Sequence, residues 1–206
     1  MRASTPLKSS PAPGRAPAWS LRELTAAGLF AALTAVAAVI TIPMPFVPFT
    51  LQVLVTLLSG AVLGARAGAL SQAVYVLMGA IGLPVFAGRN GGVQALAGPT
   101  GGYLLGFILA AWVVGRLFER SSTAGPWRAM GAMALGLAAI HVPGVLVLSY
   151  HTGSLASALA VGAAFLPVDI VKAAGAYLLA KSLAAHGLAL RAPAWSGPGE
   201  QRGRTV

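Results

Sequence analysis

The sequence predicts an all-α membrane protein, a compact bundle of six transmembrane helices with both termini on the cytoplasmic side. Three observations lead to this fold class: long apolar segments recur along the 206 residues, only 9% of the residues are charged, and the basic residues gather on one side of the apolar segments. A soluble domain carries about 25% charged residues. Within the apolar segments, apolar and polar residues do not alternate as they do along the strands of a membrane barrel. The chain has no cysteine, which excludes thiol chemistry.

Six apolar segments are long enough, or nearly so, to cross a bilayer. The second is short for a full crossing. The segment His151–Phe165 is too short to cross, and we expect a surface or re-entrant helix there, because Pro167 suits the first position of the sixth helix. The expected spans are Leu21–Ile42, Phe49–Leu63, Ala67–Leu83, Gly101–Phe118, Trp127–Tyr150 and Pro167–His186.

Two polar tails are expected outside the six-helix membrane domain, which covers residues 21–188. Residues 1–20 are rich in Pro, Ser and Ala and are expected to form a disordered cytoplasmic tail. The alternative is a cleavable signal peptide, because basic residues precede the first apolar run; the length of that run and the spans after it favour the tail. Residues 189–206 contain Pro and Gly and are expected to be a second cytoplasmic tail.

The basic residues test the six-span layout. Six spans place both termini on one side, and every Lys and Arg except Arg89 and Lys172 then falls on that side, which predicts that this side is cytoplasmic. A net charge of +10 is also typical of nucleic-acid binding, but charges in tails and short loops between apolar spans indicate membrane topology instead. The residues on the predicted cytoplasmic side are Arg2, Lys8, Arg15, Arg22, Arg66, Arg116, Arg120, Arg128, Lys181, Arg191, Arg202 and Arg204.

An acid and a base lie three residues apart in the apolar stretch "LPVDIVKAAG". Asp169 and Lys172 share one face of a helix at this spacing. Lys172 is about 14 Å along the helix from Lys181, which marks the membrane interface, so it lies near the middle of the bilayer. A charge at that depth costs at least about 2.5–3.5 kcal/mol and by default marks a ligand or ion pathway. The sequence leaves two interpretations open: a ligand pocket open to the outer side, or a structural ion pair.

Two unusual loops lie on the outer side. "PMPFVPF" (Pro43–Phe49) is apolar and stiffened by proline, and Val85–Gly102 is rich in glycine. Both are expected either to cover a cavity or to pack on the helix ends. The glycine spacing does not match a nucleotide-binding loop. Asn90 offers an amide donor and acceptor, and Tyr103 offers a flat ring with a hydroxyl.

Four motifs in order, "TIPMPFVPFTLQ", "GAIGLPVFAG", "GPTGGYLLGF" and "FLPVDIVKA", resemble those of the BioY family, the biotin-binding S components of energy-coupling factor (ECF) transporters. The resemblance covers about Leu21–Ala185. It implies a multi-pass protein of the bacterial plasma membrane that binds biotin from outside. It also implies partners, namely a transmembrane coupling protein and two cytoplasmic ATPases. No cofactor, metal, catalytic residue or nucleic-acid partner is expected, and the chain is not expected to be an enzyme.

The resemblance, together with the polar and aromatic residues noted above, gives an expected biotin site. Which residue meets the ureido ring and which meets the carboxylate stays open. His141 lies where the resemblance leads us to expect an uncharged residue, so it is expected to be a neutral, hydrogen-bonded packing residue. The expected site residues are Asp169, Lys172, Asn90, Tyr103, Gln52, Arg89, Gly91, Gly92, Phe86, Phe46 and Tyr75.

Small residues recur along the first span at Ala27, Ala31 and Ala35, where they form a smooth stripe that lets another helix approach closely. The resemblance implies that this stripe docks the coupling protein; the alternative is an internal packing face.

Two other functions compete with the S-component interpretation. A stand-alone carrier of biotin, or of another small vitamin with a carboxylate, would share the pocket chemistry, whereas an enzyme is disfavoured because Asp169 is the only acid deep within a span.

Overall fold

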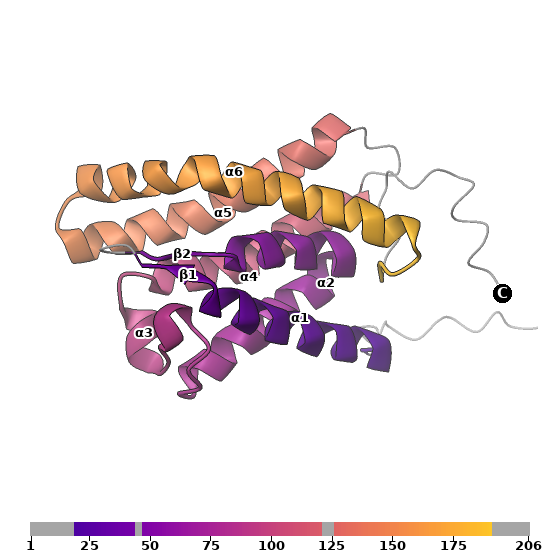
Figure 1. The fold of residues 1–206 in the computed structure, drawn as a ribbon, viewed down its shortest axis with the longest axis horizontal. Coiled ribbons are helices and arrows are strands. Elements are labelled where there is room, and N and C mark those ends of the chain that lie inside the picture. Colours follow the sequence, from indigo (N-terminus) through magenta and orange to yellow (C-terminus); the bar gives the residue numbers. More distant parts are fainter. Residues whose placement is uncertain (1–18, 44–46, 121–125, 191–206) are drawn as a thin grey trace, which may run out of the picture.

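The computed structural model describes residues 19–43, 47–120 and 126–190. Long helices lie side by side along the longest axis of the molecule (Figure 1). In the described part of the chain, five helices are long and apolar enough to cross a membrane. They are α1 (Leu21–Val39), α2 (Gln52–Ala80), α4 (Gly101–Arg120), α5 (Pro126–Thr152) and α6 (Leu155–Ala185). The short elements are the antiparallel pair β1 (Thr41–Ile42) and β2 (Phe49–Thr50), the 3-10 turn η1 (Ala87–Arg89) and α3 (Val93–Ala97).

Helix α2 folds back on itself at Gly64. This residue has φ 82° and ψ 178°, a conformation that only glycine adopts without strain. The arms before and after it run antiparallel: a Cβ on Gly68 would lie 2.9 Å from the Cα of Gly60, and Thr56 Oγ1 donates to Gln72 Oε1 at 3.1 Å. The second and third expected spans are therefore the two arms of α2, and the sequence placed the break between them correctly.

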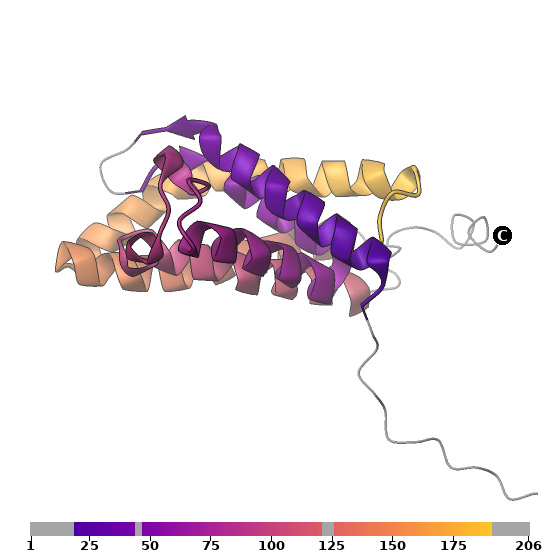
Figure 2. The ribbon, with the colours of Figure 1, turned by 90° about the horizontal axis from the view of Figure 1, so that it is seen from below.

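One end of the bundle gathers both ends of the described chain. The Arg66 guanidinium lies 4.5 Å from the centre of the Trp19 ring, the Ala65 N–H donates to Glu119 Oε1 at 3.0 Å, and the Leu190 N–H donates to the Val62 carbonyl at 3.0 Å. The start of α1, the turn of α2, the end of α4 and the end of α6 thus meet there. Figure 2 shows α3, the β1–β2 pair and the α5–α6 connection at the opposite end.

The basic residues are distributed unevenly between these two ends of the bundle. Among the described residues outside the middle of the bundle, Arg89 in η1 is at the end opposite the termini. The other basic residues lie in the turns of the helices nearest the termini, as the six-span layout predicts. They are Arg22, Arg66, Arg116, Arg120, Arg128 and Lys181.

The expected start of the sixth helix at Pro167 is wrong. Helix α6 runs unbroken from Leu155, where the Ser154 Oγ caps it by accepting the Ser157 N–H at 3.2 Å, and Pro167 lies inside it. Residues 155–165 are therefore its first turns and not a separate surface or re-entrant helix. A proline inside a membrane helix is tolerated when neighbouring groups form hydrogen bonds with the backbone groups that the proline leaves without a partner. Asp169 consequently lies near the middle of α6, far from the positive helix end.

A buried polar network joins α1 to both arms of α2. Gln72 Nε2 donates to Thr34 Oγ1 at 3.2 Å and to Ser59 Oγ at 3.3 Å, while its Oε1 accepts from Thr56. All four side chains are fully buried. Since a buried polar group that loses its partner is destabilising, the network depends on this glutamine.

Replacing Gln72 with Ala should lower the free energy of unfolding by about 1–3 kcal/mol, because Thr56 loses its acceptor. Unfolding of the detergent-solubilised protein by heat or denaturant measures this. Leu77→Ala is the matched control, since Leu77 is on the same helix and 61% exposed. Equal stability of the two variants would contradict the structural role of the network.

Candidate functional site

A cavity of about 400 Å³ lies near the end of the bundle opposite the termini. Its wall comes from the β2–α2 junction, the segment from Phe86 to Pro99, the first turns of α4, and the middle of α5 and α6. Its polar lining residues are Thr50, Gln52, Asn90, Gln94, Thr100, Tyr103, His141, Asp169 and Lys172. Its larger apolar lining residues are Val47, Val53, Phe86, Leu104, Phe107, Ile140 and Phe165.

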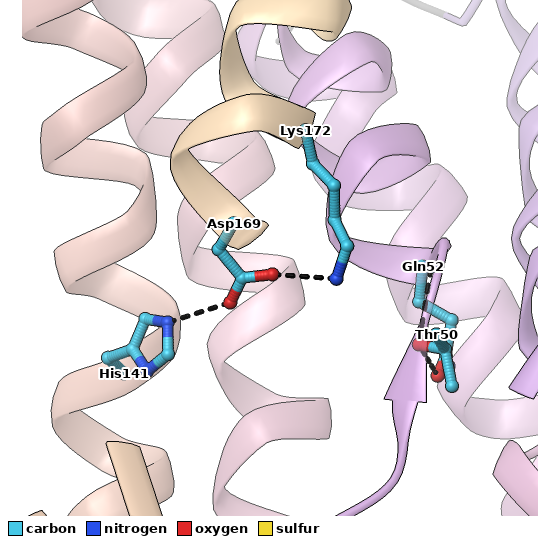
Figure 3. A network of polar contacts seen from close by, with 5 residues as sticks. All are labelled: Thr50, Gln52, His141, Asp169 and Lys172. Atoms are coloured by element: carbon cyan, nitrogen blue, oxygen red, sulfur yellow. Dashed lines mark hydrogen bonds and ion pairs between the residues drawn. The ribbon is translucent and has the colours of Figure 1, made fainter. Parts of the chain in front are cut away.

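Asp169 and Lys172 form an ion pair in the wall of this cavity (Figure 3). Lys172 Nζ lies 2.7 Å from Asp169 Oδ1, and the residues are 7% and 2% exposed. The i,i+3 spacing predicted their shared face. Because both side chains line a cavity, the pair is not enclosed in a dry bundle, and a molecule in the cavity can contact both charges.

His141 is the third member of this cluster: the hydrogen bond expected for it is present, but its partner is an acid and its ring lines the cavity, where we expected a packing residue. Its Nε2 lies 3.0 Å from Asp169 Oδ2, across the α5–α6 contact, and its ring lines the cavity. The partner is 28 residues away in sequence, so only the fold brings the two together. A titratable side chain inside an apolar span was itself the signal, because such residues usually mark functional sites.

The opposite wall depends on Gln52 at the start of α2. Its Oε1 accepts from Thr50 Oγ1 at 2.8 Å, and its Nε2 bonds to the Tyr75 hydroxyl, which in turn donates to the Val85 carbonyl at 3.1 Å. Tyr75 is fully buried and does not line the cavity. It therefore lies behind Gln52 as a support, whereas we expected it to pack on the ligand.

The glycine-rich segment turns tightly at the cavity mouth. The Phe86 N–H donates to the Asn90 carbonyl at 2.9 Å, and Asn90 Nδ2 donates to the Ala87 carbonyl at 3.1 Å. Gly91 is required because a Cβ there would lie 2.4 Å from the Leu83 carbonyl oxygen. Phe86, Asn90 and Gly91, which are expected site residues, line the cavity.

Two other expected site residues, both described by the structure, do not line the cavity. Arg89 is exposed, with its backbone at φ 62°, and Gly92 is outside the lining, where its N–H donates to the Gly79 carbonyl at 2.7 Å. Phe46 lies outside the described residues. The structure therefore gives neither Arg89 nor Gly92 a contact with the cavity.

Aromatic residues that sequence reasoning missed complete the wall. Phe165 lines the cavity and packs against Phe49, with ring centres 4.2 Å apart, and Phe107 lines it from α4. Tyr103, which was expected, packs edge-on to His141 with ring centres 5.9 Å apart. Neither phenylalanine stands out in an apolar helix, because the hydrophobic pattern does not separate cavity-facing from core-facing positions.

The alanine stripe of α1 faces the inside of the bundle. Ala27 and Ala31 are each 1% exposed, and Ala35 is partly buried and packs against the core. Their burial favours the internal packing face over the expected docking face. The exposed side of α1 instead carries larger side chains such as Leu29 and Val36.

The cluster can bind a small polar ligand with apolar rings. It offers an anion, a cation and amide groups along one wall, and aromatic rings along another, in the pattern that small-molecule sites share. Within the described ranges, no group of three or more His, Cys, Asp or Glu side chains is placed to hold a metal ion.

Comparisons with known proteins agree on one family. Residues 9–188 match the sequence profile of the BioY family. The chain is 47% identical over 164 residues to "Biotin transporter BioY" of Thermotoga maritima, which covers 79% of this chain and 96% of that protein. It is 38% identical over 186 residues to "Biotin transporter BioY" of Rhodobacter capsulatus, with 80% and 94% covered. A crystal structure described as the S-component for biotin from an ECF-type ABC transporter superposes with a TM-score of 0.72 at 26% identity, covering 79% of this chain and 90% of that one.

Removing one charge of the pair should destabilise the ligand-free protein more than removing both. Asp169→Leu leaves a buried ammonium without its anion, a change that lowers stability by about 3–5 kcal/mol in other proteins. Lys172→Met likewise leaves the carboxylate with only His141. The double variant should be more stable than Asp169→Leu, measured by unfolding in detergent. If the double variant loses as much free energy of unfolding as the two single variants together, the two charges do not interact.

Proposed function

The chain belongs to the BioY family, and we propose that it is the biotin-binding S component of an ECF transporter. In this role it captures biotin from the extracellular side and delivers it for uptake. The observation that carries the proposal is the cavity of about 400 Å³ with the buried Asp169–Lys172 pair in its wall. Its volume lies within the range of about 300–1,000 Å³ that small-molecule sites occupy.

The chemistry of the wall suits biotin. Biotin has a ureido ring with two N–H donors and a carbonyl, a thioether ring and a chain that ends in a carboxylate. Asp169 can accept a ureido N–H, because each carboxylate oxygen has spare lone pairs beyond its one bond to Lys172 or His141. The ammonium of Lys172 has further N–H donors for a ligand oxygen, by preference the carboxylate. Phe86, together with Phe107 and Phe165, offers an apolar surface for the rings.

The ion pair also explains how an empty site stays stable. With no ligand in the cavity, Asp169 and Lys172 neutralise each other at 2.7 Å, so neither charge is left alone in the bundle. A ligand that carries both N–H donors and a carboxylate can partner both groups. A ligand without the ureido group leaves a buried acceptor unmet, at a penalty of about 1–3 kcal/mol.

The orientation is inferred from the charges. The cavity lies toward the end that carries Arg89, while the other described interfacial basic residues lie at the end of the termini. The positive-inside rule then supports cytoplasmic termini, six crossings and a cavity that opens to the exterior of the bacterial plasma membrane. In this proposal a transmembrane coupling protein and two cytoplasmic ATPases energise release, and this chain needs no cofactor of its own.

Neutralising the pair should weaken biotin binding. Asp169→Asn and Lys172→Met should each raise the Kd for biotin at least about tenfold, because each removes a charged partner of the ligand. Isothermal titration of the detergent-purified protein measures this. Lys181→Met is the matched control, since Lys181 is exposed on the same helix. Parent-like affinity in both variants would refute the site assignment.

Uptake should depend on the partner module. Liposomes that contain this chain alone should accumulate no radiolabelled biotin, and liposomes with the coupling protein, the ATPases and internal ATP should accumulate it. Net uptake by the chain alone would instead support the stand-alone carrier. Biotin binding is also measured in the liposomes that contain this chain alone. If biotin binds there but is not taken up, the binding site is intact and the absence of uptake is not due to failed reconstitution.

A further inference from the structure

We infer that the Tyr103 hydroxyl and His141 Nδ1 form a donor–acceptor pair that recognises an adjacent C=O and N–H on the ligand, the edge that a cyclic urea presents. The inference deepens the proposed function and rests on it, because biotin carries such a ring. It assigns a second polar contact region to the cavity, next to the Asp169–Lys172 pair.

Both atoms lack a partner. Across the residues that the structure describes, Tyr103 Oη and His141 Nδ1 are the buried side-chain polar atoms without a hydrogen bond. They belong to neighbouring rings, with centres 5.9 Å apart and planes at 86°, and both residues line the same cavity. Buried polar atoms are nearly always hydrogen-bonded, so two exceptions on neighbouring rings call for an explanation. A ligand that supplies both partners is the simplest one.

The bond to Asp169 fixes the chemical character of Nδ1. The Asp169 carboxylate, ionised beside Lys172, accepts a hydrogen bond and does not donate, so His141 Nε2, 3.0 Å away, carries the hydrogen. Lys172 already balances the charge of Asp169, so a neutral His141 leaves the buried cluster without net charge, and Nδ1 of that ring then holds a free lone pair and accepts a hydrogen bond. The Tyr103 hydroxyl is a donor. The two atoms together are complementary to an N–H and a C=O on the same side of a ring.

Packing holds the two rings in place. Tyr103 is 7% exposed, and its ring lies so close to Gly144 that a Cβ there would be 2.4 Å from the ring carbon Cε1. The tyrosine is therefore positioned by its contacts and not by a hydrogen bond of its hydroxyl. Both polar atoms are buried, so a ligand reaches them through small movements of the side chains around the two rings, of the kind that commonly accompany binding.

Two substitutions separate recognition from structure. Tyr103→Phe removes only the hydroxyl. His141→Gln keeps a donor where Nε2 bonds to Asp169 and removes the Nδ1 acceptor. Each should raise the Kd for biotin about tenfold, as expected for one lost hydrogen bond. The unfolding temperature of ligand-free Tyr103→Phe should stay the same or rise, because the hydroxyl has no partner to lose. Tyr150→Phe, at an 85% exposed position of α5, is the matched control.

Titration with analogues tests the ligand edge. Desthiobiotin keeps the cyclic urea, so its affinity should fall by the same factor in both variants, whereas any weak binding of lipoate, which has no urea, should not change. Parent-like biotin affinity in Tyr103→Phe and His141→Gln, or a lower unfolding temperature of ligand-free Tyr103→Phe, would overturn the inference. A different result would refute the proposed function itself: no binding of biotin by the unmodified protein.

Discussion

The structure depends on a carboxylate that is buried in the middle of a membrane bundle. A charge at that depth is costly, and it persists only when other groups hold it. Asp169 meets this condition through two contacts: Lys172 at 2.7 Å on its own helix and His141 at 3.0 Å on the neighbouring one. The two contacts join α5 to α6 and leave the three polar groups facing one cavity. The same cluster thus balances the buried charge and, in the function we propose, contacts the ligand.

The rest of the fold builds the wall opposite this cluster. The turn of α2 at Gly64 lets its two arms pack together, so that Tyr75 on the second arm can support Gln52 at the start of the first. The same tyrosine holds the Val85 carbonyl, where the glycine-rich segment begins. A change at the turn that moves the second arm is therefore expected to reach Gln52 and Val85 through their hydrogen bonds to Tyr75.

Features that depend on local patterns could be predicted from the sequence. Hydropathy located the apolar segments and the break inside α2, and helical spacing placed Asp169 and Lys172 on one face. Prediction failed where tertiary contacts decide. Pro167 suggested a helix start, but the apolar residues before it continue the helix from Ser154. His141 has its acid on another helix, and Tyr75 supports the wall from behind. Alanine spacing predicted a stripe without showing which way it faces.

The central claim is that the cluster around Asp169 is a ligand site. The most direct measurement is an experimental structure of this protein with biotin bound. The account predicts the vitamin inside the cavity, with a polar atom within hydrogen-bonding distance of Asp169 or Lys172 and its rings against the aromatic wall. Biotin bound elsewhere, with Asp169 and Lys172 still paired only to each other and His141, would contradict it.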